Sequence, residues 1–526
     1  MDPDKLSTPE RALWQAFPRG ELVDLTGART ARARTVRAEV IATLLLGAVP
    51  SEPGRIASLR LAGARVAGAL DLGHATVPTP VRMRACEFGE PVDLSGIKAR
   101  DVDLEGATLA GLVAPLAEID GNLVIASCAC AGQIVLTGAH VTGALQMSGA
   151  RIDNPGGVAL LANRLVIDDD LLALQASVDG EWRMGAAQVG GIVNLNGATI
   201  RNDGGRALDA SNMTVGARFL ARDGFSARGE VQFSSTRIGG DLSLREAVLS
   251  NPGGDALLAF GVQTGGSVSL SGVRAQGALR LSRATIGAAI FLDGAQLVNP
   301  KGDAIRCRNT RAQTLTLGPG LQADGNVDVR QSQFAEIRDD QGCWPARMRL
   351  SGLSYDGLEP ALPAAARVQW LHQDVDGYLP QNYETLAAMY RGLGDDAAAR
   401  AVLLAKERRR REQLPWYGQL WSWTQEATIG YGYRPLRAAT WLAAFVAIGT
   451  IVFGLHHPPP FPGTAHAAFN PFIYTVDLLV PLVDLGLRNA YDPQGPQRWL
   501  AYFLIAVGWI FVTTIAAAIV RVLQRQ

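Results

Sequence analysis

The sequence predicts a mainly β protein whose centre is a parallel β-solenoid with helices at both ends. Three observations support this fold class: glycine accounts for 58 of 526 residues, a motif returns at intervals of 48 or 49 residues, and apolar residues follow a two-three-two spacing inside it. A motif that recurs at a nearly fixed interval indicates stacked structural repeats rather than a globular domain.

The repeat is clearest in four segments that begin at Gly143, Gly191, Gly240 and Ala288. Their starts are 48, 49 and 48 residues apart, and each segment carries an asparagine at the same place, before a glycine-containing turn. These residues are Asn154, Asn202, Asn251 and Asn299. Shorter glycine-led units lie between the segments, so one period holds four units of roughly 12 residues.

Within a unit, the apolar residues lie two, four, seven and nine positions after the leading glycine, as in Val193, Leu195, Ala198 and Ile200. A step of two keeps side chains on one face of a strand, whereas a step of three requires a bend. Each unit is therefore expected to form two very short strands. Two units make one coil, and roughly 12 coils stacked about 4.8 Å apart would enclose one apolar core.

Residues 92–111 read VDLSG IKARD VDLEG ATLAG and come closest to a strict five-residue repeat. This stretch resembles the pentapeptide-repeat family, which implies a right-handed, four-sided β-solenoid. Elsewhere one or two extra residues per unit interrupt the five-residue spacing, so coil shape and handedness stay open.

Helices are expected on both sides of the solenoid, which we place at residues 53–336. Residues 8–18 and 35–47 have helical patterns and form an N-terminal cap, residues 1–52, with a capping box from Ser7 and Glu10. A connector at 337–380 leads to a helical hairpin at 381–415, broken at Gly392–Asp395 and ending in basic residues. Residues 416–526 form the last region, a membrane domain.

Two uncharged apolar runs in that region, 438–455 and 499–520, have the length expected of membrane-spanning helices. Basic residues precede the first run and follow the second, which predicts that both chain ends face the cytoplasm. The start of the chain lacks the pattern of a secretory signal. The candidate contacts with the membrane surface are Arg408, Arg409, Arg410 and Arg411; a solvated helix face is the alternative for this run.

Residues 471–486, between the two runs, are apolar but too short to span, which favours a re-entrant segment with acidic residues Asp477 and Asp484. This layout resembles two-helix pore-loop channels of the potassium-channel type. Their T-V-G-Y-G filter is missing at this place, while the related string Thr428–Gly432 precedes the first run. An amphipathic element packed against the helices is the alternative.

Taken together, the strings AFPRGELVDL, RAEVIATLLLGA, YETLAAMYRGLG and GYGYRP resemble a bacterial family often labelled membrane-associated oxidoreductases. This resemblance implies a bacterial protein. Together with the charge pattern and the missing secretory signal, it leads us to expect the inner membrane, with both termini and the solenoid in the cytoplasm. The label implies redox activity, for which we find no motif in the residues.

No catalytic residue, cofactor or metal site is predicted. The five cysteines contain no C-x-x-C pair and are expected to be packed, reduced thiols, and the six histidines form no metal-ligand motif. The 49 basic and 49 acidic residues balance, which argues against nucleic-acid binding.

The candidate binding ridge consists of the four repeated asparagines, which would stack along one edge of the solenoid; ordinary turn formation is the alternative. The leading functional hypothesis is a membrane-anchored binding or scaffold module with lipid, a protein partner and a second copy of the chain as partners. A channel-like or signalling membrane protein is the second hypothesis, and an oxidoreductase is the third.

Overall fold

The computed structural model describes residues 6–429, 431, 435–461, 468–480 and 484–523. For residues 421, 424–425, 427–429, 435–439 and 512–523 it describes the backbone alone. The chain forms two compact units, Met1–Thr385 and Leu386–Gln526.

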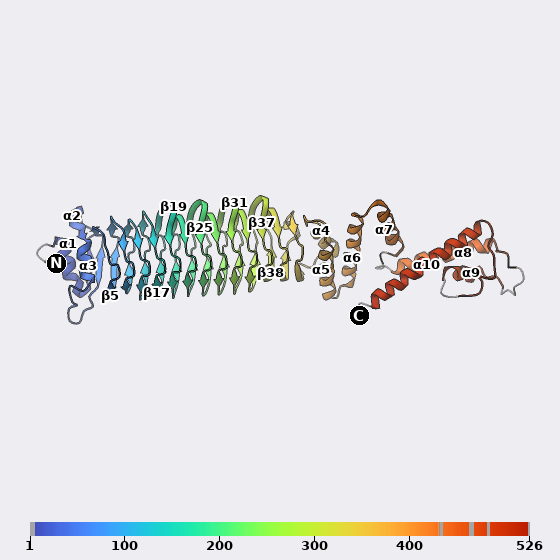
Figure 1. Ribbon diagram of the computed structural model, residues 1–526, viewed down its shortest axis with the longest axis horizontal. Coiled ribbons are helices and arrows are strands. Elements are labelled where there is room, and N and C mark those ends of the chain that lie inside the picture. Colours follow the sequence, from blue (N-terminus) through green and yellow to red (C-terminus); the bar gives the residue numbers. More distant parts are fainter. Residues whose placement is uncertain (1–5, 430, 432–434, 462–467, 481–483, 524–526) are drawn as a thin grey trace. The chain divides into compact units, whose positions relative to one another are not determined.

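The first unit is built on a parallel β-solenoid of about 14 turns (Figure 1). Over the described residues its strands form two sheets, of 25 and 17 strands, and neighbouring strands run parallel. The predicted fold class is therefore confirmed for this unit. Because each turn bonds to the turns before and after it, open sheet edges exist only at the two ends.

Most strands are two residues long, and they alternate with tight bends. One turn contains β20 (Val166–Ile167), β21 (Leu171–Leu172) and β22 (Ser177–Arg183), and the next contains β23 (Gln188–Val189), β24 (Val193–Asn194) and β25 (Thr199–Asp209). Leu171 pairs with Val193, 22 residues later, and Val193 pairs with Phe219, 26 residues later. Short and long turns alternate, so the 48-residue repeat of the sequence spans two turns.

The inward positions predicted from the two-three-two spacing form the core. Val193, Leu195, Ala198 and Ile200 are all fully buried, and the equivalent residues of the other units are buried too. Larger side chains, among them Trp182 of β22, are also fully buried. The small Ala198 follows Gly197, which has a φ of 69° at the bend. Arg283 adopts a similar φ of 59° at an equivalent bend, so the bends do not all require glycine.

Helices and two short strands cover the N-terminal end. They are α1 (Thr8–Ala16), α2 (Ala31–Arg34), α3 (Ala38–Leu45), β1 (Val23–Asp24) and β2 (Thr35–Arg37). The two strands pair with β3 (Leu59–Ala62) and β4 (Arg65–Ala67), so the cap hydrogen-bonds directly to the first turn. The predicted capping box is present in α1, where the Ser7 N–H donates to Glu10 over 2.8 Å.

The solenoid strands continue beyond residue 336, where the sequence placed their end. The last of them are β38 (Arg311–Leu317), β40 (Gln333–Asp339), β41 (Met348–Arg349) and β42 (Ser354–Glu359). Helix α4 (Ala364–Leu371) follows, and its Arg367 donates to Asp339 over 2.5 Å. Both side chains are at most 1% exposed, so this ion pair is part of the packing at the C-terminal end of the stack.

The second unit is helical. Its helices are the end of α5 (Pro380–Gly392), α6 (Asp396–Arg411), α7 (Trp416–Ile429), α8 (Pro435–Leu455), α9 (Pro471–Leu479) and α10 (Pro496–Leu523). Helices α5 and α6 break at the predicted place, and Asp395 caps α6 by accepting from the Ala398 N–H over 2.8 Å. A separate core that includes Phe453, Tyr474 and Leu504 joins α8, α9 and α10.

The predicted membrane spans are not supported. Within the described residues, no helix is both long enough and apolar enough to cross a membrane. The predicted spans at 438–455 and 499–520 fall on α8 and α10, and each extends into residues whose side chains lie outside the described part.

Candidate functional site

Four arches project from the 17-stranded sheet, one on every second turn (Figure 1). Each belongs to an 11-residue strand, and these arch strands are β19 (Arg151–Leu161), β25, β31 (Val248–Leu258) and β37 (Gln296–Arg306). The strands between and after them have seven residues and are β22, β28 (Ser226–Gln232), β34 (Arg274–Arg280) and β39 (Gln322–Asp328). The arches hold the extra residues of the long turns, because Asp179 pairs with Arg201 while Trp182 pairs with Leu208.

The four repeated asparagines lie in these arches, so they do stack along one edge of a sheet. Each side-chain amide donates to the carbonyl four residues later in its own arch, over 2.7 to 2.9 Å. The acceptors are Val158, Arg206, Asp255 and Asp303. The asparagine amides therefore close the arches, which supports the turn-forming alternative. Whether they also contact a partner stays a prediction.

A groove runs beside the second and third arches. It has a volume of about 570 Å³ and crosses five successive strands, β25, β28, β31, β34 and β37. Two rows of outward side chains form its floor, and the walls include Asp203 of one arch and Asn251 and Pro252 of the next. One row contains Ser226, Val248, Arg274 and Gln296, and the other contains Arg228, Ser250, Gln276 and Val298.

The floor of the groove combines basic, amide and apolar groups. Val248 and Val298 are 40% and 46% exposed, although most valines in the solenoid are buried. Arg228 and Arg274 are also exposed, and the Ser250 hydroxyl donates to the Gln276 side chain over 3.2 Å. The groove therefore offers two positive charges, hydrogen-bonding groups and apolar contact along one line.

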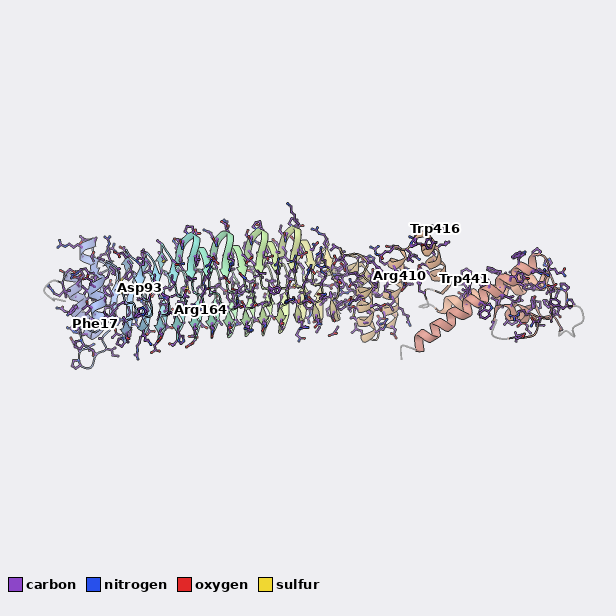
Figure 2. The ribbon with its side chains drawn as sticks, viewed as in Figure 1. Phe17, Asp93, Arg164, Arg410, Trp416 and Trp441 are labelled. Carbon is purple, nitrogen blue, oxygen red and sulfur yellow. The ribbon has the colours of Figure 1, made fainter. Side chains whose placement is uncertain are left out.

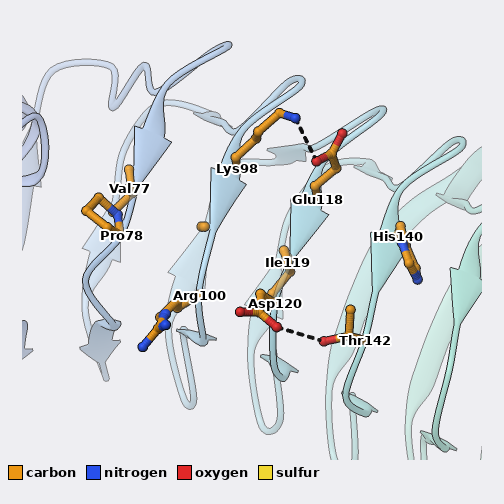
Figure 3. A pocket seen from close by; sticks show the side chains of 10 residues that line it. Val77, Pro78, Lys98, Arg100, Glu118, Ile119, Asp120, His140 and Thr142 are labelled. Atoms are coloured by element: carbon orange, nitrogen blue, oxygen red, sulfur yellow. Dashed lines mark hydrogen bonds and ion pairs between the residues drawn. The ribbon is translucent and has the colours of Figure 1, made fainter.

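A second hollow has a volume of about 400 Å³ and lies on the 25-stranded sheet (Figure 3). It is nearer to the N-terminus than the groove is. Its side chains come from neighbouring turns and pair with one another: Lys98 lies 2.9 Å from Glu118, and the Thr142 hydroxyl donates to Asp120 over 3.5 Å. His140 lies 3.0 Å from Asp168. Because these charged and polar groups already pair between turns, this hollow offers fewer free charges than the groove.

The basic run that ends α6 makes ion pairs within the second unit. Arg408 and Arg411 both contact Glu426 of α7, at 2.6 and 2.5 Å. Arg409 pairs with Glu412, and Arg410 lies 3.6 Å from Glu407. Burial alone would raise the pKa of Glu426, but the hydrogen bonds from Arg411 and Arg408 outweigh it and lower that pKa. Two of the four arginines thus position α7.

The acidic residues of the predicted re-entrant segment have different surroundings. Asp477, in α9, is 1% exposed and accepts from the N–H groups of Leu485, Leu487 and Arg488 over 2.7 to 3.0 Å. Asp484 is exposed and accepts from Gly486 N–H over 2.8 Å. Residues 481–483 of this segment and parts of the string 428–432 lie outside the described residues. Asp477 therefore holds the chain that follows α9, and a role for either acid in a pore stays a prediction.

The cysteines are packed thiols. Cys86, Cys128, Cys130 and Cys307 are buried, and Cys343 is half-buried. Burial raises the pKa of Cys86 to about 11 and those of Cys128 and Cys307 to about 12. At neutral pH these thiols are protonated, which makes them poor nucleophiles and poor metal ligands.

Sequence reasoning missed the groove, although its signal was present. The floor residues lie next to buried residues such as Leu249 and Ala275 in their strands. Because side chains of a strand alternate between two faces, the sequence would have identified each floor residue as outward-facing. Their assembly into two rows depends on which strand lies beside which, and on the extra arch residues that shift the register.

Comparisons with known proteins do not extend this description. No protein-family model matches the chain, and neither a curated protein nor a solved structure matches it. The resemblances to the pentapeptide-repeat family and to the oxidoreductase-labelled bacterial family therefore gain no support. What identifies this chain is its fold, a parallel β-solenoid of about 14 turns.

Proposed function

We propose that the chain is a binding or scaffold module whose groove holds an extended, acidic peptide segment of a protein partner. The observation that carries the proposal is the pair of outward rows that line the groove on four successive strands, next to the arch of a fifth. Four spacings of about 4.8 Å make the groove roughly 19 Å long, which matches about six residues of extended peptide.

The chemistry of the floor favours a peptide with acidic and small apolar side chains. Arg228 and Arg274 can pair with carboxylates, while Val248 and Val298 give apolar contact and Gln276 gives hydrogen bonds. A nucleic acid is a weaker match for the groove. Its phosphate backbone usually requires many basic contacts, whereas the groove has two arginines and the acidic Asp203. The volume lies within the range of ordinary ligand sites.

The proposal can be tested with an array of hexapeptides and the purified full-length chain. We expect the bound peptides to be enriched in Asp and Glu. For the peptide that binds most tightly, the double variant Arg228→Glu with Arg274→Glu should weaken binding at least about tenfold. The two new glutamates would repel the acidic side chains of the peptide. Fluorescence polarisation of the labelled peptide gives the dissociation constants.

The matched control reverses two exposed arginines on the other sheet, Arg237→Glu with Arg311→Glu. This variant has the same net charge as the groove variant and should bind the peptide as the unmodified chain does. Equal losses in both variants would show that the interaction follows net charge alone and would remove the groove from the proposal. An array with no bound peptide would do the same.

A further inference from the structure

Helix α7 presents large aromatic side chains to solvent. Trp416, Tyr417, Leu420 and Trp423 are 76%, 65%, 65% and 62% exposed. Their spacing of one, four and seven positions places them on one face of the helix. Exposed tryptophans in such a row are unusual for a protein surface and mark an interaction site.

The same unit fixes basic residues beside this aromatic face. Glu426 of α7 contacts Arg408 and Arg411 of α6, and the Arg411 guanidinium lies 5.0 Å from the centre of the Trp423 ring. Figure 2 labels Arg410 on α6 and Trp416 on α7. The two ion pairs and the ring contact hold the end of α6 against α7, so the basic run lies next to the helix that carries the aromatic face.

The charge of this surface is positive. Residues 406–426 contain five basic residues, Lys406 and Arg408–Arg411, and three acidic residues, which leaves a net charge of +2. Arg409 and Arg410 keep 42% and 63% of their side-chain surface exposed although each has a glutamate partner. The whole chain has no net charge, so the excess is local.

We propose that α7 lies in the headgroup layer of an anionic lipid surface, with its aromatic face in the lipid and Arg409 and Arg410 against the headgroups. Tryptophan and tyrosine are enriched at this depth of a bilayer. A helix with an aromatic and leucine face beside basic residues is typical of elements that lie in the interface plane. The anionic lipid attracts the net positive charge, which a neutral partner would not.

The test follows one position of α7 in the full-length chain. Tyr417→Cys is labelled with a polarity-sensitive fluorophore in a Cys343→Ser background, because the other four thiols are buried. With vesicles of phosphatidylcholine and phosphatidylglycerol we expect a blue shift of the label, and with phosphatidylcholine alone a much smaller one. The same label at Gln263→Cys, an exposed site of the solenoid, should not shift with either vesicle.

Two variants separate the apolar and the charged contributions. In vesicle titrations followed by the label at 417, Arg409→Ala with Arg410→Ala should weaken the response to the anionic vesicles about 10- to 30-fold, since each basic residue contributes separately. Trp416→Ala should weaken the response to both vesicles. Phe260→Ala, a 40% exposed aromatic residue of the solenoid, is the matched control and should change neither.

Three results would overturn the proposal. The first is vesicle binding without a shift at position 417, since another segment would then hold the chain on lipid. The second is a shift that needs no vesicles and grows with protein concentration, which would indicate a second copy on α7. The third is a shift of equal size with both vesicles, which would remove the role of the anionic headgroups.

Discussion

Glu10 shows how one buried carboxylate joins the N-terminal cap to the solenoid. It is 2% exposed and accepts from Ser7 N–H and from the backbone and side chain of Arg37, in the strand that pairs with the first turn. Burial by itself would raise the pKa of Glu10, but these hydrogen bonds and the positive charge outweigh it and lower the pKa from 4.5 to about 2.

This shift predicts a pH dependence. Because the pKa of Glu10 is lower in the folded chain, the ionised group stabilises the fold above pH 4.5, and this contribution, about 3 kcal/mol, is lost as the pH falls toward 2. Glu10→Gln should therefore lower the urea midpoint of the cap at pH 7 and have little effect at pH 2. Glu39→Gln, an exposed residue of α3, is the control, and an equal loss at both pH values would contradict the prediction.

Arg367 has a comparable place at the other end of the first unit. It pairs with the buried Asp339, which also accepts from the Trp344 ring N–H over 2.9 Å, and it donates to the Pro360 carbonyl over 2.7 Å. Arg367→Met should cost about 3 to 5 kcal/mol of unfolding free energy, because it leaves an unpaired buried carboxylate.

The double variant Arg367→Met with Asp339→Leu distinguishes this cause from a general packing loss. It should recover much of the stability, since no buried charge is left unpaired. Urea unfolding measures both variants, with Arg338→Met, an exposed neighbour, as the control. A double variant as unstable as the single one would show that packing and not the unpaired charge is responsible.

At the scale of the element, a column of glycines allows successive turns to approach each other closely. A Cβ added at Gly239 would lie 2.0 Å from the Gly216 carbonyl oxygen, and one at Gly265 would lie 2.1 Å from the Gly239 oxygen. The same close approach occurs at Gly190 and Gly287. Gly190, Gly239 and Gly287 each come directly before a segment of the repeat, which begins at the next residue. Glycine is therefore required at these positions by contact between turns.

Gly239→Ala should therefore destabilise the solenoid by more than about 3 kcal/mol, because backbone has to move and no flexible side chain can give way. Thermal unfolding of the full-length chain measures the change. Gly89→Ala is the matched control, since a Cβ there would meet nothing within 4 Å. Similar melting temperatures for Gly239→Ala and the unmodified chain would mean that the turns can separate at little cost.

At the scale of the whole molecule, the solenoid is a stack in which each turn bonds only to its neighbours. Damage at one end should therefore spread over a few turns and leave the other end intact. In Arg367→Met we expect amide hydrogens of residues 311–359 to exchange faster, while those of 59–113 keep their protection, as measured by mass spectrometry. A uniform acceleration along the solenoid would show that it unfolds as one cooperative unit.

The spacing of apolar residues was sufficient to predict the solenoid because burial of Val193, Leu195, Ala198 and Ile200 follows directly from strand geometry. It was insufficient for the number of turns, since the extra residues of the arches and the strands after residue 336 carry no such spacing. For the candidate site, too, the sequence predicted one part and the structure was needed for the other. The asparagines were visible as a repeat, but their bonds to carbonyls four residues later show a structural use that sequence repetition does not reveal.

The acidic residues near the C-terminus illustrate the same limit. Asp477 and Asp484 have the same side chain and lie seven positions apart, yet one is buried against three amides and the other is exposed. Composition treats them alike, because it contains no information on which backbone groups approach each carboxylate.

The sequence by itself determined the stacked solenoid and its buried face, because a period of two and a recurring bend are local properties of the chain. Only the tertiary structure decided which outward residues meet, since Ser226, Val248, Arg274 and Gln296 come from different turns and become neighbours through the register of the strands. The groove and the aromatic face of α7 both depend on such contacts between distant segments.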